Sequence, residues 1–307
     1  MTGLHDRLAD YLSVRRGLGF KLERAGLLLA DFVTFMDREG ATNITTALAL
    51  AWAADVQGGA NWRAGRLGVV RGFAQYVQAI DPATEVPPAD LLPREGRRAA
   101  PFIYSEVDIL GLMSASQGLR TRIRRSTYAT LIGLLAVTGM RVGEAIQLDR
   151  SDISWKDGVL MVRNAKLGKS RLVPLHSTTV QALHEYARLR DESVTCPRND
   201  SFFVTPTGTR LLYCNVQSTF SRLTRAAGIQ PRSQRCRPRL HDLRHTFTVR
   251  SVMGWYRDGL DVPAKLPILS TYLGHTNPRA TYWYLSGTPE LLGLAAQRLQ
   301  ASLGELP

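Results

Sequence analysis

The chain has 307 residues, of which 44% are hydrophobic, a composition typical of a globular protein with a real core and a length that suggests two domains. Lysine and arginine number 39 against 26 aspartate and glutamate, so the formal net charge is +13. Residues 1–95 hold 10 basic and 11 acidic residues, whereas residues 96–307 hold 29 and 15. The positive excess therefore belongs to the second part of the chain, where it predicts a polyanionic partner.

Cysteine content and apolar runs bear on the compartment. The three cysteines are odd in number and widely spaced, which argues against a disulfide framework or a zinc ribbon and indicates a reducing compartment. The first seven residues contain no apolar signal region, and the longest apolar run, around 131–137, is too short to cross a bilayer. We therefore expect a cytoplasmic protein with no membrane partner.

Residues 1–80 predict a small bundle of four helices. The expected segments are 4–14, 23–38 closed by Gly40, 46–54 capped by Thr46, and 62–80. A bundle of this kind could serve dimerisation or regulation, or it could clamp DNA. Its near-neutral charge does not favour DNA, but three arginines share the last helix and could line a DNA-facing side: Arg63, Arg66 and Arg71.

A segment rich in proline and charge, 81–100, predicts an interdomain linker, and a second domain begins at 101. Ser105 and Asp108 form a candidate capping box for a helix through Met113. The apolar segment 127–137 predicts a central buried helix that stops at Thr138-Gly139. Arg141 begins the next helix and either pairs with Glu144 or points into a cleft.

The middle of the second domain predicts strands. Residues 158–163 and 170–175 form a hairpin whose tip carries Lys166 and Lys169, and 201–204 with 210–212 add a third strand or a small ribbon. The loop-like segment 231–239 contains no acid. It is expected to face a phosphate backbone with its four arginines, Arg232, Arg235, Arg237 and Arg239.

A helix predicted over 241–256 places His241, Arg244, His245 and Thr248 on one face. Three interpretations compete for that face. It could be a surface helix with solvated charges, a zinc site built on the two histidines, or an anion site in which arginine clamps a phosphate and histidine carries a proton. A short helix is expected after Pro278, followed by an amphipathic helix over 289–303 that packs either on its own domain or on a neighbouring subunit.

Four motifs occur in one order along the second domain. They are Thr138-Gly139-Met140-Arg141 with Glu144; Lys166 followed by Arg171-Leu172-Val173-Pro174-Leu175; His241-Asp242-Leu243-Arg244-His245; and Leu273-Gly274-His275 with Tyr284 nine residues further on. In this order and spacing the chain resembles the tyrosine recombinase (phage-integrase) family over roughly 101–290. Its layout is similar to that of short Xer-like and transposon-encoded members.

The resemblance implies a mainly α fold with a small antiparallel β-sheet (α+β). Residues 1–80 would be a helical core-DNA-binding domain, 81–100 a linker, and 101–307 the catalytic domain with its C-terminal helix at 289–303. It implies a site-specific recombinase that needs neither metal nor ATP. The partners would be double-stranded DNA at recombination sites, a tetramer on two sites, and accessory recombination proteins as further candidates. The protein would associate with the nucleoid when bound to DNA.

The resemblance also assigns six catalytic residues. Tyr284 would attack the scissile phosphate to give a 3′-phosphotyrosyl enzyme, Arg141 and Arg244 would clamp the non-bridging oxygens, and Lys166 would protonate the leaving 5′-oxygen. His241 would handle the tyrosine proton and His275 would donate to a phosphate oxygen.

The sequence departs from the family pattern in places. Residues 256–270 predict a loop that is longer and richer in proline than expected, Tyr272 and Tyr282 crowd the nucleophile, and Lys169 rivals Lys166. Three other functions compete: a non-catalytic DNA-binding regulator with the same fold, a type IB topoisomerase-like relaxing enzyme, and a zinc hydrolase using His241, His245 and His275.

Overall fold

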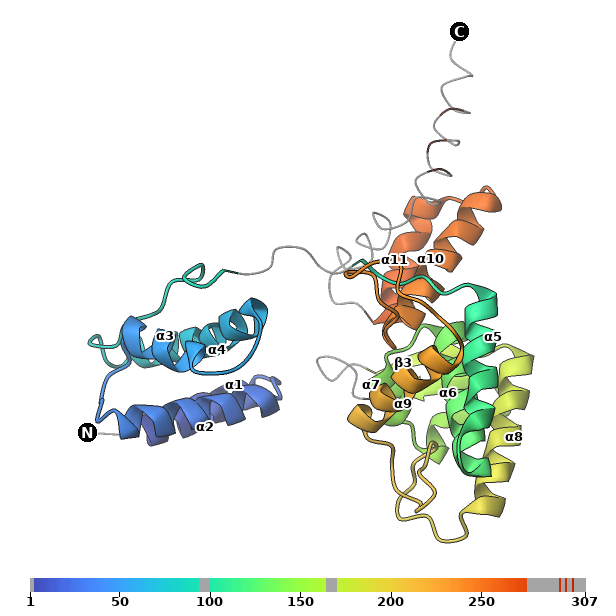
Figure 1. Cartoon of the computed structure of the whole chain (residues 1–307), viewed down its shortest axis with the longest axis horizontal. Coiled ribbons are helices and arrows are strands. Elements are labelled where there is room, and N and C mark those ends of the chain that lie inside the picture. The colour runs from blue at the N-terminus through green and yellow to red at the C-terminus, as the bar shows by residue number, and fades with distance from the viewer. Residues whose placement is uncertain are drawn as a thin grey trace. The chain divides into compact units, whose positions relative to one another are not determined.

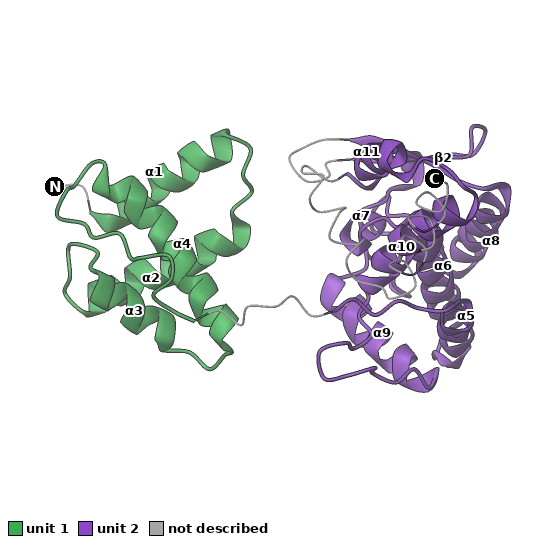
Figure 2. Ribbon diagram, turned by 90° about the horizontal axis from the view of Figure 1, so that it is seen from above, with its two compact units in different colours: residues 1–98 green, residues 99–307 purple. Residues whose placement is uncertain are grey.

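The computed structural model describes residues 3–93, 100–163 and 170–274, together with the single positions 293, 296 and 300. The chain divides into two compact units, residues 1–98 and 99–307 (Figure 2). No helix within the described ranges is long and apolar enough to span a membrane. The hairpin tip 164–169, most of the predicted C-terminal helix 289–303, and His275 and Tyr284 lie outside the described residues.

The described residues of the first unit, 3–93, form four helices: α1 (Leu4–Gly17), α2 (Glu23–Arg38), α3 (Thr46–Ala54) and α4 (Ala60–Gln78). They enclose one apolar core whose largest members include Phe32, Trp52 and Phe73. Helix α3 is capped one residue earlier than predicted, because the hydroxyl of Thr45 accepts a hydrogen bond from the backbone N–H of Leu48 at 3.2 Å. Thr46 is the first helical residue instead.

The second unit is mainly helical with one small sheet (Figure 1). Its elements in chain order are α5 (Glu106–Ala115), η1 (Ser116–Gly118), α6 (Arg122–Thr138), α7 (Val142–Ile146), η2 (Arg150–Asp152), β1 (Ile153–Ser154), β2 (Val159–Val162), β3 (Arg171–Pro174), α8 (Ser177–Ser193), α9 (Tyr213–Ala226), α10 (Asp242–Arg257) and α11 (Val262–Leu273). The mainly helical fold with a small antiparallel sheet is thus the predicted one.

Helix α6 lies at the centre of the second unit and packs against α5, α8 and α10. Burial on several sides agrees with its nearly continuous apolar sequence, and Leu131, Ile132, Leu134 and Leu135 are all buried. The predicted stop is confirmed: Gly139 follows the helix in the left-handed conformation, with φ +60°. The predicted capping box of Ser105 and Asp108 is likewise present at the start of α5.

The sheet has the order β1-β2-β3, and both pairs are antiparallel. The hairpin β2–β3 is the predicted one, but the third strand is not. Residues 201–204 and 210–212 make only isolated bridges, such as Val204 with Arg210, while Ile153–Ser154 pairs with β2. Phe202, Phe203 and Val204 are buried in succession, so this segment inserts into the core and does not alternate as a half-exposed strand would.

The segment expected to be a proline-rich loop is largely helix α11. Asp261 caps it by accepting from the N–H of Ala264 at 3.1 Å, and Pro263 lies in the first turn, where its missing N–H costs no hydrogen bond. Pro267 does lie inside the helix, and because proline disfavours a helix interior, the sequence predicted a loop here. Burial of an apolar stripe against α10 offsets that cost, through Val262, Leu266, Leu269 and Leu273.

Gly139 offers a test of the packing between the end of α6 and α10. A Cβ atom added there would stand 2.3 Å from Cδ1 of Phe247 on α10. We expect Gly139→Ala to lose about 1–2 kcal/mol from the positive φ and roughly 1–3 kcal/mol more from the overlap. Gly228→Ala is the matched control, because Gly228 has φ +69° with nothing within 4 Å. Equal losses in urea denaturation for the two variants would contradict the close approach of α6 and α10.

Candidate active site

Arg244 lies in the first turn of α10 and is almost completely enclosed by the protein. The residue is only 2% exposed, which excludes the surface-helix interpretation of the His241–Thr248 face. Its Nη1 donates to the backbone oxygen of Gly139 at 2.9 Å, and its Nη2 donates to that of Leu273 at 2.6 Å. One guanidinium therefore joins the end of α6, the start of α10 and the end of α11.

Arg141 lies close to the same point. It is the N-cap residue of α7, and its Nη1 donates to Oε1 of Glu144 at 2.8 Å. Its Nη2 donates to the backbone oxygen of Gly274 at 3.1 Å. Arg141 and Arg244 thus bind the carbonyls of two consecutive residues, Leu273 and Gly274. The pairing with Glu144 that the sequence left open is present.

Glu144 also pairs with Arg171, the first residue of β3, through contacts at 3.1 and 2.7 Å. Burial alone would raise the pKa of this carboxyl group. The hydrogen bonds and charges of Arg171 and Arg141 outweigh that effect and lower its pKa to about 2. Glu144 is therefore a carboxylate at any physiological pH. Sequence reasoning named Arg171 as part of the second motif but gave it no role in the site.

His241 is the N-cap residue of α10, and its ring stands edge-on to that of His245 with 5.0 Å between centroids. The residue as a whole is exposed. The protein around its ring lowers the pKa to about 4, and the positive charges of Arg244, Arg141 and Arg239 add to the effect of burial. The imidazole is therefore neutral near pH 7 in the absence of a ligand, and it has the capacity to accept a proton.

The start of α10 is fixed by a buried carboxylate. Asp242 is 0% exposed and accepts from Nε and Nη2 of Arg239 at 3.0 and 2.9 Å. Residues 100–104 run alongside: Tyr104 donates its hydroxyl to the backbone oxygen of Arg239 at 3.0 Å, and its N–H to Oγ1 of Thr246 at 2.9 Å. The first residues of the second domain therefore belong to the scaffold of the site.

The basic segment 231–239 is partly engaged within the protein. Arg232 donates to the backbone oxygen of Ile103 at 2.9 Å and lies over the ring of Phe102. Arg239 is bound to Asp242 as described, so these two arginines have structural partners. Arg235 and Arg237 are exposed. The prediction that the segment contacts a phosphate backbone now rests mainly on this second pair.

Arg66 corrects one expectation for the first unit. It is only 6% exposed, its guanidinium lies 3.7 Å above the ring of Trp52, and it donates to the backbone oxygen of Trp52 at 3.2 Å. It is a core residue and cannot line a DNA-facing side. The helical spacing placed Arg66 correctly on α4 but could not show that a tryptophan would cover it. Arg63 is exposed and Arg71 is half-buried.

Three predicted catalytic residues lie outside the described residues, namely Lys166, His275 and Tyr284, as does the predicted DNA-binding residue Lys169. His275 directly follows Gly274, whose carbonyl binds Arg141. Within the described ranges, no three side chains of His, Cys, Asp or Glu gather closely enough to hold a metal ion. The third zinc ligand in the zinc-hydrolase alternative, His275, lies outside those ranges.

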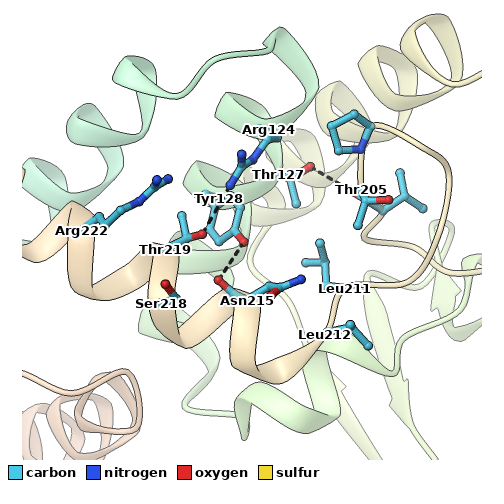
Figure 3. A pocket seen from close by; sticks show the side chains of 12 residues that line it. Arg124, Thr127, Tyr128, Thr205, Leu211, Leu212, Asn215, Ser218, Thr219 and Arg222 are labelled. Atoms are coloured by element: carbon cyan, nitrogen blue, oxygen red, sulfur yellow. Dashed lines mark hydrogen bonds between the residues drawn. The ribbon is translucent and has the colours of Figure 1, made fainter.

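A cavity of about 350 Å³ lies elsewhere in the second unit, between α6, α9 and the segment before α9 (Figure 3). Arg124 and Tyr128 of α6 and Asn215 and Thr219 of α9 are among its lining residues. Tyr128 precedes Gly139 by eleven residues, or about 16 Å along a helix. The cavity is therefore separate from the arginine pair.

Comparison with known proteins agrees with this arrangement. The phage integrase family model matches residues 105–290. A Sinorhizobium fredii protein classed as an integrase/recombinase is 41% identical over 308 residues, covering 98% of each chain. Two solved structures share the fold: the Tn1549 transposon integrase with transposon right end DNA (TM-score 0.66, 15% identity, 98% and 99% covered) and a lambda integrase tetramer bound to a Holliday junction (0.60, 19%, 91% and 79%).

The fold is that of a tyrosine recombinase, an enzyme of site-specific DNA recombination. The chain belongs to the phage integrase family.

The pair of Asp242 and Arg239 generates a prediction about stability. Arg239→Ala leaves a buried carboxylate without its cation and is expected to cost about 3–5 kcal/mol. Asp242→Asn removes the buried charge and should cost less, about 1.5–3 kcal/mol. Burial already raises the pKa of Asp242 in the folded protein. The loss in free energy of unfolding caused by Arg239→Ala should therefore become smaller at acid pH. The reason is that, as the pH falls, Asp242 takes up a proton in the folded state before it does so in the unfolded state.

Urea denaturation of both variants at pH 7 and pH 5, each compared with the wild type at the same pH, checks this order. A larger loss for Asp242→Asn at pH 7, or an Arg239→Ala deficit that widens at pH 5, would show that the buried charge does not dominate.

Proposed function

We propose that the chain binds duplex DNA at specific sites and exchanges strands through a 3′-phosphotyrosyl intermediate. The observation that carries this proposal is the pair of guanidinium groups, Arg141 and Arg244, anchored on the adjacent carbonyls of Leu273 and Gly274. Two cations held by rigid backbone groups suit the non-bridging oxygens of a phosphodiester, whose negative charge must be stabilised during transfer. The Tn1549 integrase of the same fold was solved with transposon end DNA.

The proposed chemistry balances without an external energy source. The phenolic oxygen of Tyr284 bonds to the scissile phosphorus, and the bond from phosphorus to the 5′-oxygen breaks. His241 accepts the tyrosine proton, Lys166 gives a proton to the departing 5′-oxygen, and His275 donates to a phosphate oxygen. Attack by a 5′-hydroxyl of another strand reverses these steps and releases the tyrosine.

The state of His241 supports its proposed role. Burial is the main cause that lowers the pKa of His241 to about 4, and the charges of Arg244 and Arg141, which would face the scissile phosphate, lower it further. A bound phosphate would offset them, so the affinity of His241 for a proton would rise once DNA is in place. The bound phosphate would thus both pair with the two arginines and make His241 a stronger base.

Assembly follows by analogy with the relatives. The lambda integrase structure is a tetramer on a Holliday junction, and we propose the same arrangement for four copies of this chain on two DNA sites. The first unit would clamp DNA with exposed residues such as Arg63, and Lys169, Arg235 and Arg237 would add backbone contacts. The helix at 289–303 would dock on the next subunit; docking in cis is the alternative, and accessory proteins would assist.

The nucleophile is tested by two tyrosine variants. Tyr284→Phe should bind DNA as the wild type does and form no covalent adduct, whereas Tyr282→Phe should still form it, because residues two apart face different sides of a helix. The substrate is recovered by trapping adducts on a fragment library from the ends of the DNA element that encodes the chain, and adducts are counted on denaturing gels.

Several outcomes would overturn the assignment. Adducts that survive Tyr284→Phe and vanish with Tyr282→Phe would move the nucleophile. A wild type that binds DNA specifically without any adduct would favour the non-catalytic regulator, and relaxation of single-site plasmids without strand exchange would favour a topoisomerase. Loss of activity in a chelator would favour the zinc hydrolase.

A further inference from the structure

Arg171 is a charged residue that the proposed chemistry does not use. It opens strand β3, where it pairs with Val162 of β2. Its side chain is only 13% exposed, and its two terminal nitrogens reach the two oxygens of Glu144 at 3.1 and 2.7 Å. This two-point geometry is specific to arginine and fixes the plane of the carboxylate.

Glu144 passes this constraint on to Arg141. Its Oε1 accepts from Nη1 of both arginines, and its Oε2 accepts from Nη2 of Arg171 and from the backbone N–H of Arg141, at 2.8 Å. The carboxylate is only 8% exposed, so these bonds are shielded from water. Arg141 is thus held at both its backbone and its guanidinium by one carboxylate whose orientation Arg171 sets.

Gly274 closes the arrangement from the other side. Its φ is +66°, and a Cβ atom there would lie 3.0 Å from Nη1 and 3.4 Å from Cζ of Arg171. The guanidinium of Arg171 therefore takes up the space that a side chain would need. The carbonyl of the same glycine accepts from Nη2 of Arg141. Strand β3, helix α7 and the end of α11 meet at this point.

We propose that Arg171 is a positioning residue for strand cleavage, acting through Glu144 to fix the guanidinium of Arg141 against the scissile phosphate. The proposal rests on the proposed function, in which Arg141 binds a non-bridging oxygen. Two of the five N–H groups of Arg141 are already used in bonds to Glu144 and Gly274 that the structure describes, which leaves its orientation toward a phosphate defined in advance. An ion pair that merely stabilised the fold would have no such kinetic effect.

The experiment compares Arg171→Ala and Arg171→Lys with Arg163→Ala. Arg163 follows β2 on the same hairpin and pairs with Asp152, so its removal deletes an arginine–carboxylate pair away from Arg141. Single-turnover adduct formation is measured at saturating DNA, the dissociation constant is measured separately, and each variant is assayed below its own melting temperature. Arg171→Ala should lower the rate by about 10²-fold and change affinity by only a few-fold, as for a misplaced oxyanion donor.

The conservative variant and a second substitution sharpen the test. Arg171→Lys should recover only part of the rate, because an ammonium cannot make the two-point contact. The double variant Arg171→Ala/Glu144→Gln should cleave only slightly more slowly than Glu144→Gln alone, since the two residues act in one chain of contacts. Arg163→Ala should cleave at the wild-type rate.

A substrate with a 5′-bridging sulfur distinguishes an effect that acts through Arg141 from an effect on protonation of the leaving group. Its leaving group needs no proton, so it should rescue Lys166→Ala, if that lysine is the general acid, but not Arg171→Ala. Rescue of Arg171→Ala would show that it acts on the leaving group and overturn the proposal. A folded Arg171→Ala protein that cleaves at the wild-type rate would overturn it too. Failure of the proposed function is distinct, because the wild type itself would then form no Tyr284-dependent adduct.

Discussion

The second unit depends on one buried guanidinium. Arg244 is almost wholly removed from solvent, and backbone carbonyls at the ends of two other helices accept hydrogen bonds from its guanidinium, which offsets the cost of burying its charge. The last carbonyls of a helix lack partners within the helix and carry partial negative charge, so they suit a cation. The left-handed Gly139 and Gly274 end these helices sharply enough to bring the carbonyls within reach. The contacts that hold the second unit together are thus the same contacts that would form the proposed anion site.

This constraint explains why so many charged residues lie around the start of α10. Arg141 repeats the pattern on the adjacent carbonyl, Glu144 balances two arginines, and Asp242 balances Arg239. The carboxylates hold the cations in place without covering them completely. Burial is the main cause of the lowered pKa of His241, and the positive charges of Arg244, Arg141 and Arg239 lower it further. In the proposed reaction, side chains held in place in this way would not have to move when charge develops on the phosphate.

The sequence predicted much of this and missed specific parts of it. Helix α6 and its stop at Gly139 followed from an apolar run and a glycine, and the hairpin β2–β3 from two short strand-like runs on either side of a tip with two lysines; these signals are local. Helix α11 was missed because Pro267 argues against a helix unless tertiary burial offsets it, and the burial of Arg66 depended on Trp52 fourteen residues away. Likewise the bond from Arg171 to Glu144 spans 27 residues. Long-range contacts of this kind leave no periodic trace in one sequence, whereas the order of the four motifs does identify the family.

The most direct test of the account is the single-turnover cleavage rate of Arg244→Ala, with DNA affinity measured on the same duplex and folding checked by thermal unfolding. The account predicts that the cleavage barrier rises by about 3–4 kcal/mol, as for the loss of one preorganised donor to a developing oxyanion. Affinity should fall far less, because many other basic residues remain to contact phosphates. A folded variant that cleaves at close to the wild-type rate would remove Arg244 from the active site and contradict the account.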